Sequence, residues 1–273
     1  MNVAEAILEA TQRLTATIDT ARLDAEVLMA HCLNVSRSQM LVGMMREPAP
    51  GDFSALVARR AAHEPVAYIT GKQEFFGHEF AVEPGVLIPR SDSETLVEAA
   101  LELSAAPARV LDLGTGSGAL LISVLAQRPG AKGVGIDASP TALRVAEGNA
   151  ASLGVSGAAD FRLRDWRDAG WSDDLGEFDL ILCNPPYVEE DANLAPDVRD
   201  FEPALALFAG AEGFDDYRKL IPQLRSLMTP SAIALLEIGA TQAHAVSELA
   251  EKAGFVVALC HDLANRPRVV ILS

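Results

Sequence analysis

The stretch from Phe178 to Val188 reads Phe-Asp-Leu-Ile-Leu-Cys-Asn-Pro-Pro-Tyr-Val. Its mostly apolar run ends in an amide side chain and two prolines, and proline can neither donate to a sheet ladder nor continue a helix. We therefore predict a buried strand that stops at Asn184. Beyond it, the Asn184 amide and the Pro185 carbonyl form a pair of acceptors, Pro186 stiffens the turn, and Tyr187 adds an aromatic wall. Alone, this turn fits a structural strand end as well as a binding site.

A second stretch, upstream, predicts a ligand-binding loop. Arg109–Leu113 has the pattern of a short strand, and an apolar helix begins at Ala119. Glycines let the backbone turn sharply and approach a ligand closely, and a helix N-terminus adds free N–H groups and a partial charge of roughly +0.5. A ligand with a carboxylate or phosphate would suit this place, although glycine-rich turns also occur for packing. The loop residues are Gly114, Thr115, Gly116, Ser117 and Gly118.

The next two strands also end in acidic residues. Asp137 lies about 20 residues beyond the glycines, where nucleoside-binding folds place a carboxylate on a ribose. Ser139 and Pro140 already supply a cap and a first helical residue, so Asp137 is available for the ribose hydroxyls. Asp165 and Trp166 follow the third strand and suit an adenine ring, the acid for the exocyclic amine and the indole for stacking.

Strand and helix patterns alternate from residue 108 to 254, which predicts an α/β fold with a mostly parallel, Rossmann-like sheet and helices on both faces. Two antiparallel segments near the C-terminus should close the sheet. Ligands in such sheets bind beyond the carboxyl ends of the strands, so the loops described above should converge.

Before that domain, the sequence predicts a small helical bundle over residues 1–72 and a β-hairpin linker over 73–90, with its turn at Gly77. The larger domain then spans 91–273. Ser91 with Glu94 has the form of a capping box at its first helix. The acidic, proline-containing loop 189–203 is long enough to act as a substrate lid.

Composition limits the possible partners. The net charge of −16 and an aromatic content of only 5% argue against stable binding to nucleic acid or to an anionic membrane. Three widely spaced cysteines (Cys32, Cys183 and Cys260) indicate a reduced, cytoplasmic protein, and the five histidines do not fall at metal-ligand spacings. No apolar run approaches the ~20 residues of a membrane helix. We expect a cytoplasmic monomer without a metal.

These residues give the chain a clear resemblance. It resembles the class I S-adenosylmethionine-dependent methyltransferases and, more narrowly, the HemK-type release factor glutamine methyltransferases, over nearly its full length. Asn-Pro-Pro-Tyr is shared with enzymes that methylate amino groups of DNA and RNA, so it is the segment from Glu64 to Arg90 that narrows the choice. The motifs are Glu64-Pro-Val-Ala-Tyr-Ile-Thr-Gly71, Glu74-Phe-Phe-Gly77, Leu87-Ile-Pro-Arg90 with Glu94, Asp112-Leu-Gly-Thr-Gly-Ser-Gly118, Asn184-Pro-Pro-Tyr187, Glu202-Pro203 with Ala204-Leu205, Tyr217-Arg218 and Glu237-Ile-Gly239.

The resemblance implies an activity. It implies transfer of a methyl group from S-adenosyl-L-methionine to the side-chain amide nitrogen of the Gln in the Gly-Gly-Gln motif of class 1 peptide chain release factors, with S-adenosyl-L-homocysteine as product. Residues 114–118 would hold the methionine part of the cofactor, Asp137 the ribose and Trp166 the adenine end. The helical residues 1–72 would recognise the substrate.

The resemblance also implies that Asn184 lies between cofactor and substrate. An amide nitrogen is a poor nucleophile, because its lone pair is delocalised into the carbonyl. If the Asn184 side-chain oxygen and the Pro185 carbonyl accept its two N–H groups, they orient it toward the methyl group, and positioning rather than a general base supplies the catalysis. Pro186 keeps this corner stiff, and Tyr187 packs against the amide plane and offers an aromatic wall to a sulfonium.

Three alternatives remain open on the sequence alone. The same chemistry could act on the glutamine of another protein, such as a ribosomal protein. An amino group of adenine or cytosine in nucleic acid could be the acceptor instead, although acidity and few aromatic residues weigh against it. A non-enzymatic cofactor-binding module would leave the Asn-Pro-Pro-Tyr turn without a purpose.

Overall fold

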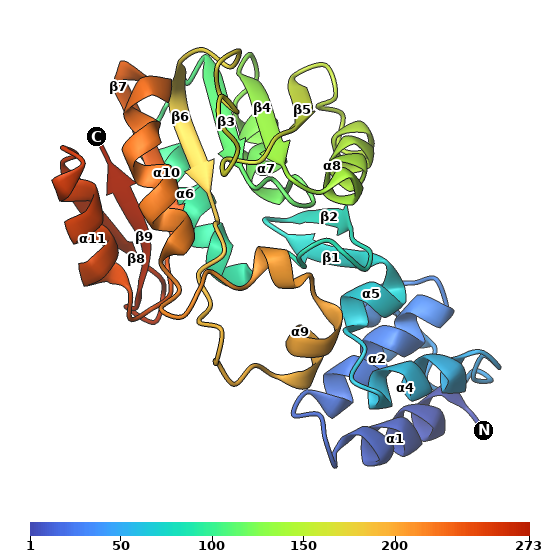
Figure 1. Ribbon diagram of the computed structural model, residues 1–273. Helices are drawn as coiled ribbons and strands as arrows, with labels where there is room; N and C mark the ends of the chain where they lie inside the picture. The colour runs from blue at the N-terminus through green and yellow to red at the C-terminus, as the bar shows by residue number, and fades with distance from the viewer. The chain divides into compact units, whose positions relative to one another are not determined.

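The computed structural model describes residues 1–273, and the chain forms two compact units (Figure 1). The smaller unit comprises Met1–Lys72 together with Leu194–Phe201, and the larger comprises Gln73–Asn193 and Glu202–Ser273. The chain thus leaves the larger unit for eight residues, 194–201, within the loop 189–203 that is long enough to act as a substrate lid.

The smaller unit is a helical bundle. Its core consists of side chains that recur on one face of each of the first helices, among them Ile7, Leu28 and Met40, all without exposed surface. Inside the bundle, Arg60 forms a buried ion pair with Asp24 at 2.6 Å. The helices are α1 (Val3–Leu14), α2 (Ala21–Cys32), α3 (Arg37–Gly43), α4 (Phe53–Ala61), α5 (Val66–Thr70) and, after the return of the chain, α9 (Pro196–Phe201).

The expected hairpin forms strands β1 (Lys72–Phe75) and β2 (His78–Ala81). Phe76 and Gly77 make the two-residue turn with φ of 50° and 72°, the left-handed conformations that a tight hairpin of this kind requires. From Gln73 onward the hairpin belongs to the larger unit, where Phe75 and Phe80 pack edge to face in the core.

The larger unit is built on a seven-stranded sheet in the order β5-β4-β3-β6-β7-β9-β8. All neighbouring pairs from β5 to β7 are parallel, and β9 runs antiparallel to both of its neighbours. The C-terminal pair is therefore antiparallel as expected, and its last strand inserts between β7 and β8. The strands are β3 (Arg109–Leu113), β4 (Lys132–Asp137), β5 (Ala159–Leu163), β6 (Phe178–Cys183), β7 (Met228–Glu237), β8 (Val257–His261) and β9 (Pro267–Leu272).

Helices cover both faces of this sheet, as the alternating pattern predicts (Figure 1). Successive residues of β3 point to opposite faces: Val110 packs with α6 (Glu94–Leu103), α7 (Ala119–Gln127) and α8 (Pro140–Ser152), whereas Leu111 packs with α10 (Asp215–Leu224) and α11 (Ala243–Lys252). Because both faces are buried, the central strands are mostly apolar, with Asp112 a buried acid in β3. Short 3-10 helices η1 (Ser91–Ser93), η2 (Ala204–Ala206) and η3 (Arg225–Leu227) complete the unit.

The strand order fixes the place where ligands can bind. From β3 the chain builds outward through β4 to β5, then returns to the other side of β3 with β6. Leu113 pairs with Cys183, the last residues of β3 and β6, so the loops that follow these strands separate from one another at the same edge. This is the switch point of an open α/β sheet, where a crevice forms.

One local prediction was wrong. Ser91 and Glu94 form no capping box, because η1 precedes α6 and Glu94 Oε1 instead accepts from the backbone N–H of Phe76 in the hairpin. The short helix α5 lies within the range 1–72 that the sequence predicts to be helical.

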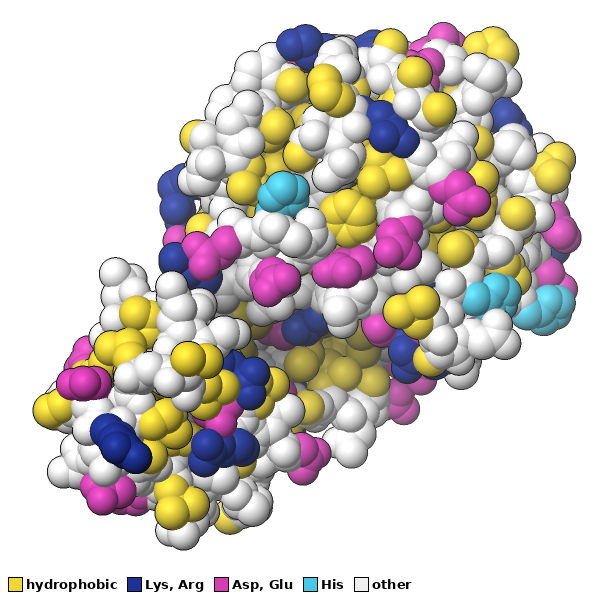
Figure 2. Space-filling view, turned by 180° about the vertical axis from the view of Figure 1, so that it is seen from behind, with side chains coloured by type: hydrophobic (Ala, Val, Ile, Leu, Met, Phe, Trp, Pro, Cys, Tyr) yellow, Lys and Arg dark blue, Asp and Glu magenta, His cyan; other side chains and the backbone are white.

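The surface and the side-chain groups add three observations. The face in Figure 2 shows Lys and Arg side chains scattered among Asp and Glu, without a continuous basic field. No helix combines the length and apolarity needed to cross a bilayer. No group of three or more His, Cys, Asp or Glu side chains is placed to hold a metal ion.

Candidate active site

The glycine loop between β3 and α7 is held open by left-handed backbone. Gly114, Gly116 and Gly118 have φ of 74°, 56° and 82°. The N–H groups of Gly114 and Thr115 both donate to the carbonyl of Ile136 in β4, at 2.9 and 2.8 Å. The Thr115 hydroxyl donates to Oδ2 of Asp112 over 2.7 Å. The loop is therefore a fixed cradle at the end of the sheet.

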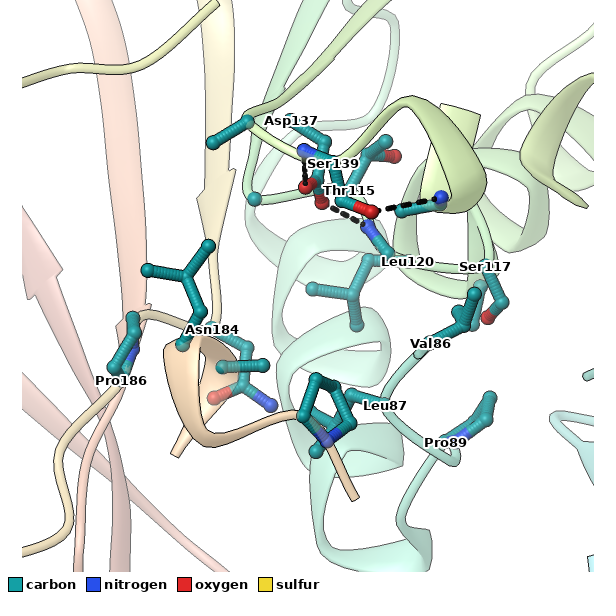
Figure 3. Close-up of a pocket in the computed structure, with 18 of the residues that line it drawn as sticks. Val86, Leu87, Pro89, Thr115, Ser117, Leu120, Asp137, Ser139, Asn184 and Pro186 are labelled. Carbon is teal, nitrogen blue, oxygen red and sulfur yellow. Dashed lines mark hydrogen bonds between the residues drawn. The ribbon is translucent and has the colours of Figure 1, made fainter. Parts of the chain in front are cut away.

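Asp137, the last residue of β4, fastens that cradle. Its Oδ2 accepts from the N–H of Gly116 at 2.9 Å and its Oδ1 accepts from the N–H of Ser139 at 2.8 Å (Figure 3). Ser139 caps α8 through Ala142, as the sequence predicts. Burial raises the pKa of Asp137, while these backbone donors lower it. A carboxylate has about four acceptor positions, so two remain for the hydroxyls of a sugar.

Trp166 and Asp165 lie on the neighbouring wall. The Trp166 ring passes so close to Gly114 that a Cβ on that glycine would come within 3.2 Å of it. Its Nε1 donates to Oδ1 of Asp216 at 2.7 Å, which fixes the plane of the indole. Asp165 forms a bidentate pair with Arg167, which keeps the pKa of the Asp165 carboxyl below its usual range.

The turn after β6 is pinned at several points. The N–H groups of Tyr187 and Val188 both donate to the carbonyl of Leu207, at 3.1 and 2.8 Å, and the side chain of Gln242 donates to the carbonyl of Tyr187 at 3.0 Å. Asn184 donates through Nδ2 to the Ser93 hydroxyl at 3.3 Å. The turn is thus rigid, and Asn184 stands where β6 ends beside the glycine loop.

A third wall comes from the segment that follows the hairpin. Figure 3 shows Val86, Leu87 and Pro89 facing the same space as Asn184 and Thr115. Glu202, a buried acid, holds this wall: it accepts from the N–H of Ile88 at 3.2 Å and pairs with Arg90. The sequence had given this segment no place in the site.

These walls enclose one cavity of about 1000 Å³, part of it open to solvent, and only residues of the larger unit line it. Nine of the residues predicted from the sequence lie on its wall. Gly118, Pro185 and Tyr187 do not: Gly118 is packed against Ile122, and Pro185 is buried. The nine are Gly114, Thr115, Gly116, Ser117, Asp137, Asp165, Trp166, Asn184 and Pro186.

Three groups were missed by the sequence analysis. Asp216 is an acid in the first turn of a helix, a place that acids favour for the helix dipole alone. Ser93 and Glu237 lie 91 residues before and 50 residues after the side chains that they approach. Only the resemblance to a family had drawn attention to Glu237, and without a role.

The cavity fits S-adenosylmethionine. A Cβ at Gly114 in its backbone cradle would come within 3.2 Å of the Trp166 ring, its half-buried acid Asp137 faces a space suited to a diol, and Trp166 supplies an aromatic face. A volume of this size is in the usual range for a pocket that binds a molecule of this kind. Residues 114–117, Asp137 and Trp166 line the cavity at this end.

Comparison with known proteins points the same way. Residues 5–71 match the family described as the PrmC N-terminal domain, and residues 105–231 match a methyltransferase domain. The release factor glutamine methyltransferase of Cereibacter sphaeroides is 43% identical over 99% of this chain and 98% of its own length. That of Rhodospirillum rubrum is 42% identical over 94% of this chain and 80% of its own.

A solved structure agrees on the fold. The crystal structure of a methyltransferase from Pyrococcus furiosus aligns with 82% of this chain and 98% of its own, with a TM-score of 0.52 and 16% identity. The cavity, its glycine cradle and the end-to-end identity to the two relatives lead to one assignment. The chain belongs to the release factor glutamine methyltransferases, a family of S-adenosylmethionine-dependent enzymes.

Proposed function

We propose that this chain methylates the side-chain amide nitrogen of the Gln in the Gly-Gly-Gln motif of class 1 peptide chain release factors. One observation carries the proposal: Asn184 stands at the wall of the cavity, beside the glycine loop, with its Nδ2 committed to Ser93. Its oxygen remains available to accept a hydrogen bond. The names of the relatives support the choice of substrate.

The cofactor end of the cavity is assigned to the residues at the ends of β3, β4 and β5. The glycine loop takes the methionine part, Asp137 the ribose hydroxyls and Trp166 the adenine ring. Asp165 has both oxygens engaged by Arg167, so we assign it a contact to the adenine amino group only through a remaining lone pair.

Bound there, S-adenosylmethionine would supply a methyl group carried on a sulfonium. Methyl transfer would form an N–C bond, break the S–C bond with its electron pair left on sulfur, and release one amide proton to water. The contribution of the chain is orientation. Asn184 Oδ1 accepts one N–H of the substrate amide and the Pro185 carbonyl accepts the other. Two fixed acceptors hold the amide plane, and orientation of this kind can supply several kcal/mol of the barrier, about 7–11 in the best cases.

The residues of the turn support the two acceptors, Asn184 Oδ1 and the Pro185 carbonyl. Pro185 is buried and its side chain does not line the cavity, whereas Pro186 lines it. Tyr187 is fixed by its hydroxyl, which donates to Glu237 at 3.2 Å, and by its backbone contacts to Leu207. We assign the Tyr187 ring to packing against the substrate amide plane.

The smaller unit is assigned to substrate recognition. It matches a family domain of its own and supplies no residue to the cavity wall. We further propose that the enzyme acts as a monomer in the cytoplasm and forms no stable complex with nucleic acid, because one unit of one chain builds the whole cavity and the net charge is −16.

The deciding experiment offers methyl-labelled cofactor to the full-length protein together with purified release factor, ribosomes or DNA in separate reactions. The proposal expects label in the release factor alone, mapped by mass spectrometry to the Gln of Gly-Gly-Gln. Label in a ribosomal protein or in DNA, with the release factor unmodified, would replace the proposal by one of its rivals. S-adenosyl-L-homocysteine should accumulate in equal amount to the methylated glutamine.

A further inference from the structure

Asn184 has one hydrogen bond within the protein, and this bond sets its polarity. Nδ2 donates to Oγ of Ser93, a residue with only 4% of its surface exposed. A side-chain amide has a donor end and an acceptor end. With Nδ2 turned to Ser93, Oδ1 is left for the substrate. The reverse orientation would present N–H groups to the N–H groups of the substrate amide, and no hydrogen bond could form.

Ser93 can hold Asn184 in this orientation only if the Ser93 hydroxyl donates its hydrogen bond to a group other than Asn184. A hydroxyl has one proton to donate, and Ser93 already accepts from Asn184. The neighbouring side chain is Glu237, at the end of β7 and 1% exposed. Its Oε2 is buried and has no hydrogen-bond partner. A buried acceptor without a hydrogen-bond partner is rare and costs free energy of folding. A buried carboxylate beside a hydroxyl is therefore expected to accept a hydrogen bond from it.

Glu237 also fixes the other end of the turn. Its Oε1 accepts from the Tyr187 hydroxyl at 3.2 Å, and its backbone carbonyl accepts from the Tyr217 hydroxyl at 2.7 Å. The Glu237 carboxylate thus holds Tyr187 directly and also adjoins Ser93, which holds Asn184. Asn184 and Tyr187 are the two polar side chains of the Asn-Pro-Pro-Tyr turn.

We propose that Glu237 is a positioning residue for methyl transfer. Its carboxylate can only accept hydrogen bonds, so it accepts from the hydroxyls of Ser93 and Tyr187 and thereby holds Asn184 with its amide oxygen toward the substrate. The inference rests on the proposed role of Asn184 and adds a residue to it. The relay runs from Asn184 through Ser93 to Glu237, each group donating to the next. A neutral side chain at position 237 could donate as well as accept, so the direction of the relay would no longer be fixed.

The charge of Glu237 makes the relay sensitive to pH. Burial raises the pKa of Glu237 to about 7, against the lowering effects of the Ser93 and Tyr187 hydroxyls and of Arg268. Below that pH the carboxyl group is protonated and can donate to Ser93, so the relay loses its direction and kcat should fall. The groups that face Glu237 are Asp92 on η1, Cys183 at the end of β6, Tyr187 in the turn after β6, Tyr217 on α10 and Arg268 on β9. Burial raises the pKa of Cys183 and of both tyrosines, so these three stay neutral between pH 6 and 9.

The kinetic test compares the wild-type protein with Glu237→Gln, Ser93→Ala and Glu237→Asp, in single-turnover methylation of release factor between pH 6 and 9. We expect Glu237→Gln and Ser93→Ala to lower the rate of transfer by roughly 10²-fold, the effect of a misplaced reacting group. In Glu237→Gln the Kd of S-adenosylmethionine should stay unchanged, because Glu237, unlike Ser93, does not line the cavity. Both variants should lose the rise in rate near pH 7, and Glu237→Asp should retain it. Exposed Glu147→Gln is the matched control and should behave as wild type.

A second measurement does not depend on the substrate. In protein labelled with ¹⁵N at asparagine, the side-chain N–H₂ resonance of Asn184 is identified by its loss in Asn184→Ala. It should titrate with a midpoint near 7 in the wild type and not in Glu237→Gln. A wild-type rate and pH profile in Glu237→Gln, or an Asn184 resonance that ignores Glu237, would overturn the inference. If the wild type fails to methylate release factor but the resonance behaves as expected, the proposed substrate is wrong and the relay stands.

Discussion

The backbone N–H of Gly116 donates a hydrogen bond to Oδ2 of Asp137 over 2.9 Å. The glycine loop after β3 and the acid at the end of β4 are therefore one structural unit, although Gly116 and Asp137 are 21 positions apart in the sequence. The interaction gives Asp137 two tasks, since the carboxylate that we assign to the ribose also sets the shape of the loop that we assign to the methionine part.

Asp137→Ala should weaken cofactor binding at both places. We expect the Kd of S-adenosylmethionine to rise roughly 10- to 100-fold, the equivalent of one hydrogen bond to a charged group, as measured by calorimetry. Asp137→Asn should lose less, because its amide oxygen can still accept from Gly116. The control is Asp160→Ala, which removes an exposed acid of β5 that does not line the cavity. An unchanged Kd in Asp137→Ala would refute the ribose assignment.

Gly114 and Gly154 permit a matched test of the cradle. Both have φ of 74°, so an alanine at either position carries the same backbone cost of about 1–2 kcal/mol. At Gly154 the new Cβ meets nothing within 4 Å, whereas at Gly114 it comes within 3.2 Å of the Trp166 ring. The Kd of the cofactor should therefore be about tenfold higher in Gly114→Ala than in Gly154→Ala, because the new Cβ at position 114 displaces the Trp166 indole. Equal Kd values in the two variants would show that Trp166 does not contact the cofactor.

The parts of the site that could be predicted from the sequence are those whose cause is local. Two prolines after an apolar run end β6 at Cys183, and glycines between a strand and a helix make the loop at Gly114. Parallel strands then bring these ends together without any further information, because their carboxyl ends share one edge. The cap of α8 at Ser139 and the hairpin turn at Gly77 are local in the same sense.

The parts that could not be predicted depend on contacts between distant residues. Trp166 is oriented by Asp216, 50 positions later, and Ile88 and Arg90 are held by Glu202, more than 110 positions later. Glu94 shows how such contacts override a local rule: its carboxylate satisfies the hairpin N–H of Phe76 instead of a helix cap. The insertion of β9 between β7 and β8 likewise leaves no mark on either strand's own pattern.

A buried acid beneath the glycine loop should make stability depend on pH. Burial raises the pKa of Asp112 from 3.8 to about 7, and only the Thr115 hydroxyl and a backbone group oppose this. As the pH rises from about 4 to 7, the unfolded chain loses this proton first, so the contribution of Asp112 to stability falls across that window. Asp112→Asn does not show this fall in stability, because the asparagine side chain does not ionise.

The measurement is the difference in Tm between Asp112→Asn and the ligand-free wild type. The Tm of Asp112→Asn should rise relative to that of the wild type from pH 4 to 7, and the difference should then level off. Each 1 kcal/mol of difference in the free energy of unfolding corresponds to roughly 2–4 °C in Tm. Comparing two chains at each pH cancels the titration of the other acids. A difference that stays constant with pH would mean that Asp112 has an ordinary pKa in the folded protein.

Asn184→Ala tests the centre of the proposed mechanism. Removing one preorganised hydrogen-bonding group from a site typically lowers kcat about 10²–10³-fold. We expect a loss of that size in glutamine methylation, with the cofactor Kd close to that of the wild type, because Gly114, Asp137 and Trp166 remain in place.

The substrate side of the same contact is tested by replacing Gln with Glu in the Gly-Gly-Gln motif of the release factor. A site built to pair two N–H groups rejects a substrate that lacks them by ~10⁴ or more, since its own acceptors are left facing oxygen. The Glu substrate should therefore be inert at all pH values above the ionisation of its carboxyl group. It should also compete poorly with the Gln substrate, because Asn184 Oδ1 and the Pro185 carbonyl repel a carboxylate. Tight competitive binding of the Glu form would show that docking elsewhere on the release factor dominates affinity, and detectable methylation of it would rule out the amide as the group that Asn184 selects.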